Sequence, residues 1–119
     1  MVAPCRGLAL AAIGRSLPCG ALPMLFAVHC VDKPDHAAVR LENRAAHLDY
    51  AHGWDAKIVF GGPLLSGDGT GMVGSLLVLD VADRAEAEAF CAGDPYGKAG
   101  LFEAVIIRPY KIVLGTRAG

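Results

Sequence analysis

Residues 56–82, AKIVFGGPLLSGDGTGMVGSLLVLDVA, decide the fold, because two apolar runs flank a short flexible linker. Residues 56–66 and 72–82 are rich in the apolar and β-forming side chains that are typical of strands. The linker GDGTG at 67–71 predicts a hairpin connection between them. The Gly-Gly-Pro at 61–63 weakens a strand ladder, so we expect a bend or bulge there.

Working outward, a further strand is predicted at each end of the folded region. Residues 24–32, MLFAVHCVD, form one continuous apolar run, and residues 101–114, LFEAVIIRPYKIVL, form another. Helical segments separate both runs from the hairpin. The order β-α-β-β-α-β is the split βαβ arrangement, a ferredoxin-like α+β fold with a four-stranded antiparallel sheet.

The first helix is predicted within residues 33–54, KPDHAAVRLENRAAHLDYAHGW. Pro34 suits a first helical turn, and Asp35 and Glu42 are acids in the early part that the helix dipole favours. The helix should end near Gly53. Side chains that recur at helical spacing predict an amphipathic helix: Ala38, Leu41, Ala45, Leu48 and Ala51 or His52.

The second helix is predicted at residues 83–93, DRAEAEAFCAG. Asp83 is a good N-cap, because its carboxylate can accept from a free backbone N–H of the first turn. Gly93 is a good helix stop. A loop is expected from Asp94 to the next strand.

The strands carry apolar side chains on both faces, as at Val28, Val59, residues 76–79 and residues 105–107. Two helices can cover only one face of a four-stranded sheet. An uncovered apolar face of several hundred Å² drives association. We therefore predict a homodimer joined sheet to sheet.

Size and composition limit the classes of function. The chain has 119 residues, which predicts one domain, and its 54% hydrophobic content excludes a disordered chain. Eleven basic and 12 acidic side chains give a net charge of −1 without a basic cluster, so no nucleic-acid partner is expected. No apolar stretch is long enough to span a bilayer, so no membrane partner is expected.

Residues 1–23 differ from the domain predicted at 24–119. They contain two arginines, no acids and three prolines, and are interpreted as an N-terminal extension for which disorder is one possibility. A weak signal or transit peptide is the alternative.

The chain has four cysteines, Cys5, Cys19, Cys30 and Cys91, and none of them forms a CxxC pair. We expect them to be reduced thiols of a cytoplasmic protein. A secreted disulfide pair is the alternative.

Several short motifs in this order resemble the YCII-related family of the dimeric α+β barrel superfamily. They are MLFAVHCVDKPD, RAAHL, GGP, GS, DPY and IIRPYKIV, and they lie within residues 24–114. The resemblance implies a ferredoxin-like protomer, a paired-sheet dimer and a site built on His47 and Asp94. The known chemistry of the family includes cofactor-free dehydrochlorination of a hydroxylated aromatic.

The residue types at this site suit acid/base chemistry. A histidine such as His47 titrates near neutral pH, so it can take and return a proton. A nearby carboxylate such as Asp94 would orient the ring and stabilise its charged form. Pro95 restricts Asp94 to extended backbone, which would aim the carboxylate reproducibly.

Other candidates for substrate binding surround this pair. Arg44 could bind an anionic oxygen or form a salt bridge with Asp49 or Glu42. Tyr96 could donate to a substrate oxygen, stack on its ring or serve in packing. Ser75 could line the cavity or face the dimer seam. Gly62 and Pro63 are expected to shape the backbone near the pocket.

The remaining histidines carry weaker expectations. His29 could project into the cavity or be buried and hydrogen-bonded, whereas His36 and His52 are expected in solvent. No spacing typical of a metal site or of a phosphate-binding loop is present, so no metal and no cofactor are predicted.

Two functions of different class remain open. The first is a cofactor-independent enzyme, lyase- or isomerase-like, that uses His47 and Asp94 on a small hydroxylated aromatic or acidic substrate. The second is a non-catalytic dimer that binds a small ligand or serves as an accessory module. In the second case, the imidazole need not lie within hydrogen-bond distance of Asp94.

Overall fold

The computed structural model describes residues 24–115. The predictions for residues 1–23, including Cys5 and Cys19, lie outside the described residues. The elements follow in the order β1 (Met24–Asp32), α1 (Ala37–His52), η1 (Asp55–Lys57), β2 (Ile58–Leu65), β3 (Met72–Val81), α2 (Arg84–Gly93), α3 (Pro95–Lys98) and β4 (Phe102–Tyr110).

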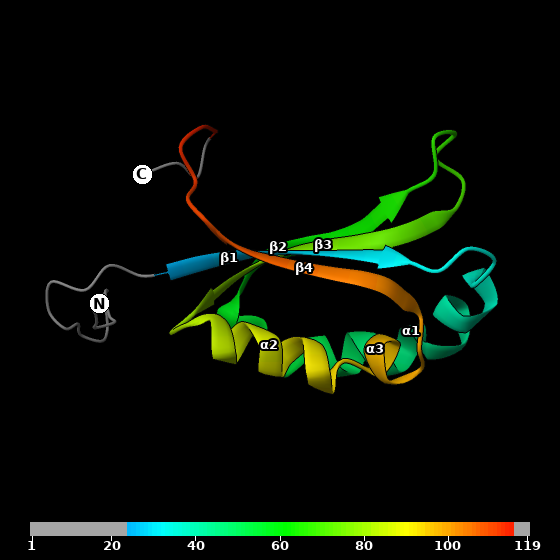
Figure 1. The fold of residues 1–119 in the computed structure, drawn as a ribbon, viewed down its shortest axis with the longest axis horizontal. Helices are drawn as coiled ribbons and strands as arrows, with labels where there is room; N and C mark the ends of the chain where they lie inside the picture. Colours follow the sequence, from blue (N-terminus) through cyan, green and yellow to red (C-terminus); the bar gives the residue numbers. More distant parts are fainter. Residues whose placement is uncertain (1–23, 116–119) are drawn as a thin grey trace, which may run out of the picture.

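The four strands form one antiparallel sheet in the order β2-β3-β1-β4. The helices lie together on one face of this sheet, and the opposite face carries no helix (Figure 1). The predicted ferredoxin-like arrangement is therefore confirmed. Within residues 24–115, no helix has the length and apolar character needed to cross a membrane.

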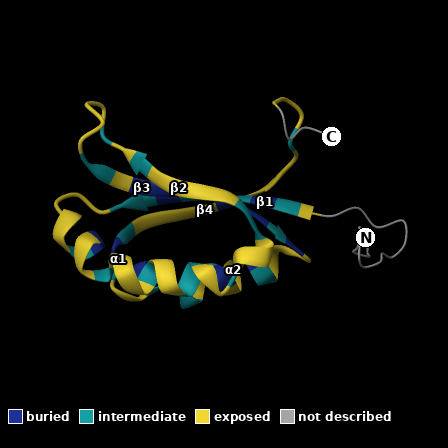
Figure 2. Cartoon of the chain, turned by 180° about the vertical axis from the view of Figure 1, so that it is seen from behind, coloured by how far each residue is buried: buried dark blue, intermediate teal, exposed yellow. Residues whose placement is uncertain are grey.

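The core lies between the sheet and the helices, where Figure 2 shows buried residues along the inner strands. Alternate side chains of β1 point toward the helices, and Phe26, Val28 and Cys30 are buried there. Ala87 and Phe90 are the buried residues of α2. The core is thus formed mainly by side chains of the central strands and of α2.

The first helix begins later than predicted. It starts at Ala37, with His36 at the N-cap position, and its first turn contains no acid. Asp35 instead has φ 62° in the turn that follows β1. A left-handed residue cannot continue into a right-handed helix, so Pro34 and Asp35 belong to the connection.

The face that α1 turns inward differs from the predicted one. Arg40 is only 3% exposed, whereas Leu41 of the predicted apolar face is 65% exposed. Arg40 is neutralised inside the fold by Asp32. Tyr50 and Trp54 pack against the core cluster and supply the apolar contact. The helix is therefore anchored by an ion pair and two aromatic rings instead of by its small apolar side chains.

Both ends of α2 lie where the sequence predicts, but the reason for glycine at position 93 differs from the expected one. Asp83 is confirmed as the N-cap, since its carboxylate accepts from the N–H of Glu86. Gly93 is the last helical residue and does not adopt the left-handed backbone of a glycine cap. A Cβ on Gly93 would lie 2.9 Å from Cζ of Tyr50, so the residue must be small because α1 passes close by. The loop expected after Asp94 is the short helix α3.

Two strand boundaries differ from the prediction by more than one residue. β2 begins at Ile58 because the preceding residues form the 3-10 helix η1, and β4 ends at Tyr110 instead of residue 114. The irregularities of β2 lie between Ile58 and Phe60 and between Leu64 and Leu65. The Gly-Gly-Pro itself keeps regular pairing with β3, so the expected bulge flanks this tripeptide.

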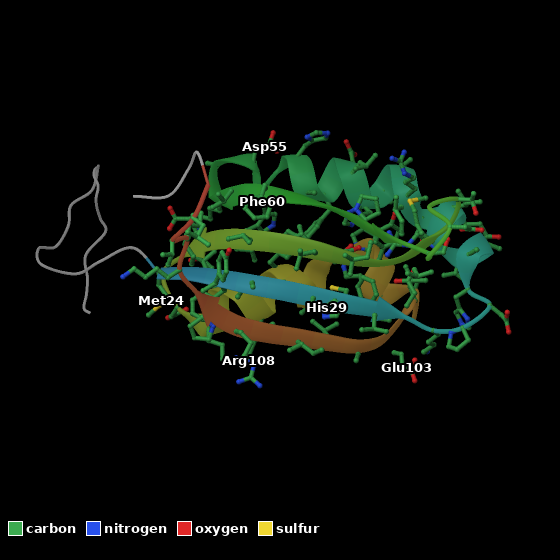
Figure 3. All side chains as sticks on the ribbon, turned by 90° about the horizontal axis from the view of Figure 1, so that it is seen from above. Met24, His29, Asp55, Phe60, Glu103 and Arg108 are labelled. Atoms are coloured by element: carbon green, nitrogen blue, oxygen red, sulfur yellow. The ribbon has the colours of Figure 1, made fainter. Side chains whose placement is uncertain are left out.

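The helix-free face of the sheet is largely apolar and partly exposed. Its side chains include Phe60, Leu76, Ile106 and Tyr110, each between 38% and 46% exposed. His29 lies at the middle of β1, paired with Leu76 on one side and Ile106 on the other (Figure 3). The two-sided apolar character expected from the sequence is present.

Candidate active site

The site is centred on a contact between α1 and the start of α3. Nδ1 of His47 lies 2.9 Å from Oδ1 of Asp94, and the side chains are 13% and 4% exposed. An ionised carboxylate only accepts hydrogen bonds, so Nδ1 must carry the hydrogen that joins them. This contact leaves Nε2 as the nitrogen that can take or give a proton. The expected proximity of the two side chains is present.

Asp94 has two partners through the same oxygen. Oδ1 also accepts from the backbone N–H of Tyr96 at 3.0 Å, which makes Asp94 the N-cap of α3. Pro95 occupies the first helical position, and Asp94 has the extended φ −66° and ψ 124° that were expected. The cap of α3 therefore holds the carboxylate toward His47.

Tyr96 contributes its ring as well as its backbone. The imidazole of His47 stacks on the phenol ring with centroids 4.1 Å apart and an interplanar angle of 14°. The guanidinium of Arg40 lies over the same ring, 4.6 Å from its centroid. Burial raises the pKa of the Tyr96 phenol although Arg40 opposes the shift, so the phenol is neutral near pH 7. Tyr96 therefore packs against His47 and fixes the plane of its ring.

Arg40 belongs to a buried polar cluster that the sequence reasoning missed. Its Nε and Nη2 donate to the two carboxylate oxygens of Asp32 at 2.7 and 2.9 Å, and Nη2 also donates to Oγ of Ser75 at 3.0 Å. Burial alone would lower the pKa of Arg40, but the contact with Asp32 outweighs it and the pKa is raised. The available signal was a carboxylate at the end of the first strand and an arginine eight positions later.

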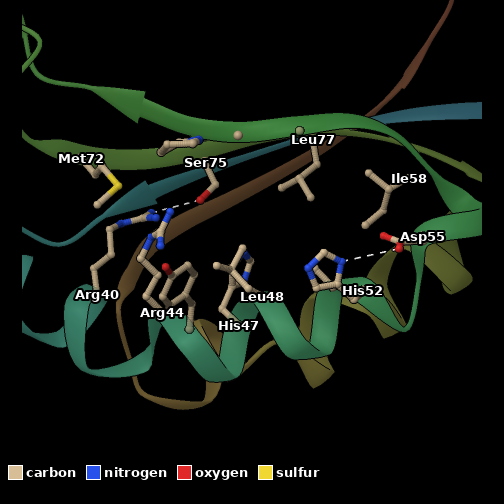
Figure 4. Close-up of a pocket in the computed structure, with 15 residues that line it drawn as sticks. Arg40, Arg44, His47, Leu48, His52, Asp55, Ile58, Met72, Ser75 and Leu77 are labelled. Carbon is tan, nitrogen blue, oxygen red and sulfur yellow. Dashed lines mark hydrogen bonds and ion pairs between the residues drawn. The ribbon is translucent and has the colours of Figure 1, made fainter.

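A cavity of about 180 Å³ lies between α1 and the edge of the sheet formed by β2 and β3 (Figure 4). An apolar cavity of about 150 Å³ accommodates benzene, so this one is sized for a molecule with a single ring. Six candidates from the sequence line it: Arg44, His47, Gly62, Pro63, Ser75 and Tyr96. Asp94 does not line the cavity, and its contact with the site is the one with Nδ1 of His47.

Two candidates for which the sequence left alternatives open can be placed relative to the cavity. Arg44 lines the cavity, and no ion pair joins it to Asp49 or Glu42 in residues 24–115. Ser75 lies on the helix-facing side of the sheet, since it pairs with the buried Cys30, and not at the opposite face. Arg44 thus supplies a positive charge to the cavity, and Ser75 supplies a hydroxyl.

The remaining polar candidates lie away from the reactive centre. His29 is on the helix-free face and does not line the cavity. His52 is largely exposed as expected, although it lies at the rim with Nδ1 3.5 Å from Oδ2 of Asp55. In the part of the chain that the structure describes, no three His, Cys, Asp or Glu side chains are grouped to hold a metal ion.

The fold and the site together define an α+β protein of ferredoxin-like topology, with a histidine–aspartate pair beside a small cavity. Comparison with known proteins shows that the chain belongs to the YCII-related domain family, which matches residues 24–111. The chain is 31% identical over 98 residues to protein YciI of Escherichia coli O6:H1 and to protein YciI of Shigella flexneri. The match covers 76% of this chain and 99% of each relative. The family predicted from the motifs is confirmed.

One solved structure has a higher sequence identity to this chain than these two relatives have. It is a 5-chloro-2-hydroxyhydroquinone dehydrochlorinase from Burkholderia phenoliruptrix AC1100 in complex with 2,5-dihydroxybenzoquinone. The identity is 38% and the TM-score 0.72, over 81% of this chain and 100% of that chain. A protein with this fold can therefore be an enzyme that acts on a small hydroxylated ring.

Proposed function

We propose that this protein is a small lyase- or isomerase-like enzyme that moves a proton on a hydroxylated aromatic or acidic substrate without a cofactor. The observation that carries the proposal is the 2.9 Å contact between His47 and Asp94 beside a cavity of single-ring size. The similarity to a dehydrochlorinase that is solved with a dihydroxybenzoquinone supports the substrate class.

Each residue has a separate task in the proposed reaction. Nε2 of His47 accepts a proton from the substrate, and the buried carboxylate of Asp94 stabilises the imidazolium that forms. The same proton then returns to another atom of the substrate or leaves with a departing group, so no further reactant is needed. Arg44 attracts the negative charge of an acidic substrate, because no carboxylate of residues 24–115 neutralises it.

The non-catalytic binding module is the second candidate, and it does not require the histidine–aspartate contact. Turnover separates the two. Purified protein is incubated with 5-chloro-2-hydroxyhydroquinone, and chloride release is measured for wild type and His47→Gln. We expect wild-type protein to release chloride, and His47→Gln to be slower by at least about 100-fold, as for loss of a general base. Binding of 2,5-dihydroxybenzoquinone by both proteins, with chloride release only at the uncatalysed rate, would favour the binding module.

We also propose that a second copy of the chain covers the helix-free face of the sheet. The support is the set of partly exposed apolar side chains on that face, which includes Phe60, Leu76 and Ile106. Burying such side chains against an identical set stabilises association by roughly 25 cal/mol per Å². The cavity is lined by residues of α1 and by the helix-facing side of the sheet, so it stays accessible in this arrangement.

A further inference from the structure

Asp32, Arg40 and Ser75 form a buried polar cluster beside the cavity, and the acid/base pair does not explain its role. Arg40 is 3% exposed and Ser75 is 5% exposed. Breaking a buried ion pair is costly, and replacing it with apolar side chains is often neutral or stabilising. A pair of this kind beside a cavity therefore calls for a role other than stability.

The hydrogen bonds determine what Ser75 can offer to a ligand. Its Oγ accepts from Nη2 of Arg40 at 3.0 Å, so the single hydroxyl hydrogen must point elsewhere. Among residues 24–115 no acceptor for that hydrogen is found, and Ser75 lines the cavity. The serine therefore presents a donor to the cavity, and the arginine fixes its direction.

The donor and the base stand on opposite walls. Ser75 extends from β3 toward α1, while Arg44 and His47 rise from α1 toward the sheet (Figure 4). A ring bound between them would have one edge at the imidazole and an oxygen within reach of the hydroxyl. The net charge of the Asp32–Arg40 pair is zero, so the cluster supplies an oriented donor without adding a second charge.

We infer that Ser75, held by the Asp32–Arg40 pair, donates a hydrogen bond to the substrate oxygen that becomes negative when His47 takes a proton. This inference rests on the proposed function. The proton leaves a hydroxyl, or a carbon next to a carbonyl, for Nε2 of His47, and its bonding electron pair moves onto the substrate oxygen. The substrate class is accordingly a small ring with an ionisable hydroxyl or an enolisable carbonyl. Preorganised donors of this kind usually contribute strongly to catalysis.

The test measures the pKa of a bound probe, 2,5-dihydroxybenzoquinone. Its ionisation is monitored by its visible absorbance as a function of pH. A donor to the ionised oxygen lowers the pKa of the bound probe. Ser75→Ala removes the hydroxyl, and Ser75→Cys keeps nearly the same shape with a weak donor. Both should raise the pKa of the bound probe by about one to two units, which corresponds to a 10- to 100-fold weaker binding of the anion.

A purely structural serine would give a different result. Both variants would then bind the neutral and ionised probe more weakly by the same factor, and the pKa of the bound probe would stay at the wild-type value. That outcome overturns the inference, as does a wild-type protein that does not bind the probe. His47→Gln is the control: in that background, Ser75→Ala should still raise the pKa of the bound probe by the same amount as in the wild-type background. Unchanged turnover in His47→Gln would overturn the proposed function alone.

The positioning role of Arg40 is tested by combining variants. Arg40→Lys retains a charge but loses the planar fork that reaches Asp32 and Ser75 together. It should raise the pKa of the bound probe in the wild-type background and have no further effect in Ser75→Ala. An equal effect in both backgrounds would mean that Arg40 contacts the probe directly. Thermal melts establish folding first, and if Arg40→Lys does not fold, the two Ser75 variants still decide the inference.

Discussion

Gly93→Ala tests the packing of α1 against the end of α2, which positions both halves of the acid/base pair. Alanine normally stabilises a helix relative to glycine by about 0.5–1 kcal/mol. Here the added Cβ would lie 2.9 Å from Cζ of Tyr50 and closer still to its hydroxyl. The ring would have to move away from Phe90, whose carbonyl accepts the Tyr50 hydroxyl at 2.9 Å.

The magnitude follows from these contacts. Loss of the hydrogen bond costs about 1 kcal/mol. Overpacking of the ring against its neighbours costs about 1–3 kcal/mol. Subtracting roughly 1 kcal/mol of helix propensity from this sum of about 2–4 kcal/mol leaves a net destabilisation of about 1–3 kcal/mol. At about 4–8 °C per kcal/mol for a domain of this size, the melting temperature should fall by roughly 4–24 °C.

Tyr50→Phe supplies the matched background, because it removes the hydroxyl that the new methyl group would meet. In that background, Gly93→Ala should cost about 1 kcal/mol less than in wild type, since the hydrogen bond and the contact with the hydroxyl are already absent while the contact with the ring remains. The four proteins are compared by urea unfolding with circular dichroism. Equal costs in both backgrounds, or stabilisation by Gly93→Ala in wild type, would refute the reasoning.

Three further predictions concern the thiols, the assembly and the extension. Burial raises the pKa of Cys30 to about 12 and that of Cys91 to about 11, so both thiols are protonated at pH 8. Mass spectrometry should find them alkylated far more slowly in the native protein than in urea, and equal rates would contradict the packing. Sedimentation at micromolar concentration should give twice the chain mass for wild type and a monomer for Ile106→Glu, and a wild-type monomer would disprove the sheet-to-sheet dimer. A protein that starts at Met24 should melt within a few degrees of the full chain, and a larger loss would mean that residues 1–23 contribute to the fold.

Most of the fold could be predicted from local signals. The apolar runs and the glycine-rich connection define the hairpin, and Asp83 marks the start of α2 because an N-cap acts within one turn. The inward face of α1 could not be predicted in this way. Burial of Arg40 depends on Asp32, which the fold brings close, and apolar spacing alone favours Leu41.

Part of the candidate site could likewise be predicted from the sequence, and part could not. The pair of His47 and Asp94 was suggested by a family resemblance together with ordinary acid/base chemistry, and Pro95 explained the aim of the carboxylate. The cluster around Ser75 depends on three elements that meet only in the folded chain. The reason for Gly93 is also non-local, since the constraint comes from a tyrosine on another helix.

The central claim is that Asp94 acts by its charge on His47, and Asp94→Asn tests it most directly. Asparagine keeps an oxygen that can still accept from His47 and from the N–H of Tyr96, so the cap of α3 is preserved while the charge is removed. Turnover of 5-chloro-2-hydroxyhydroquinone is measured for Asp94→Asn, with His47→Gln as the baseline without a base and with unfolding curves as the control for structure. We predict a rate at least about 10-fold below wild type, with about 10⁴-fold as an upper guide from a serine-protease triad. A wild-type rate in a folded Asp94→Asn protein would contradict the account.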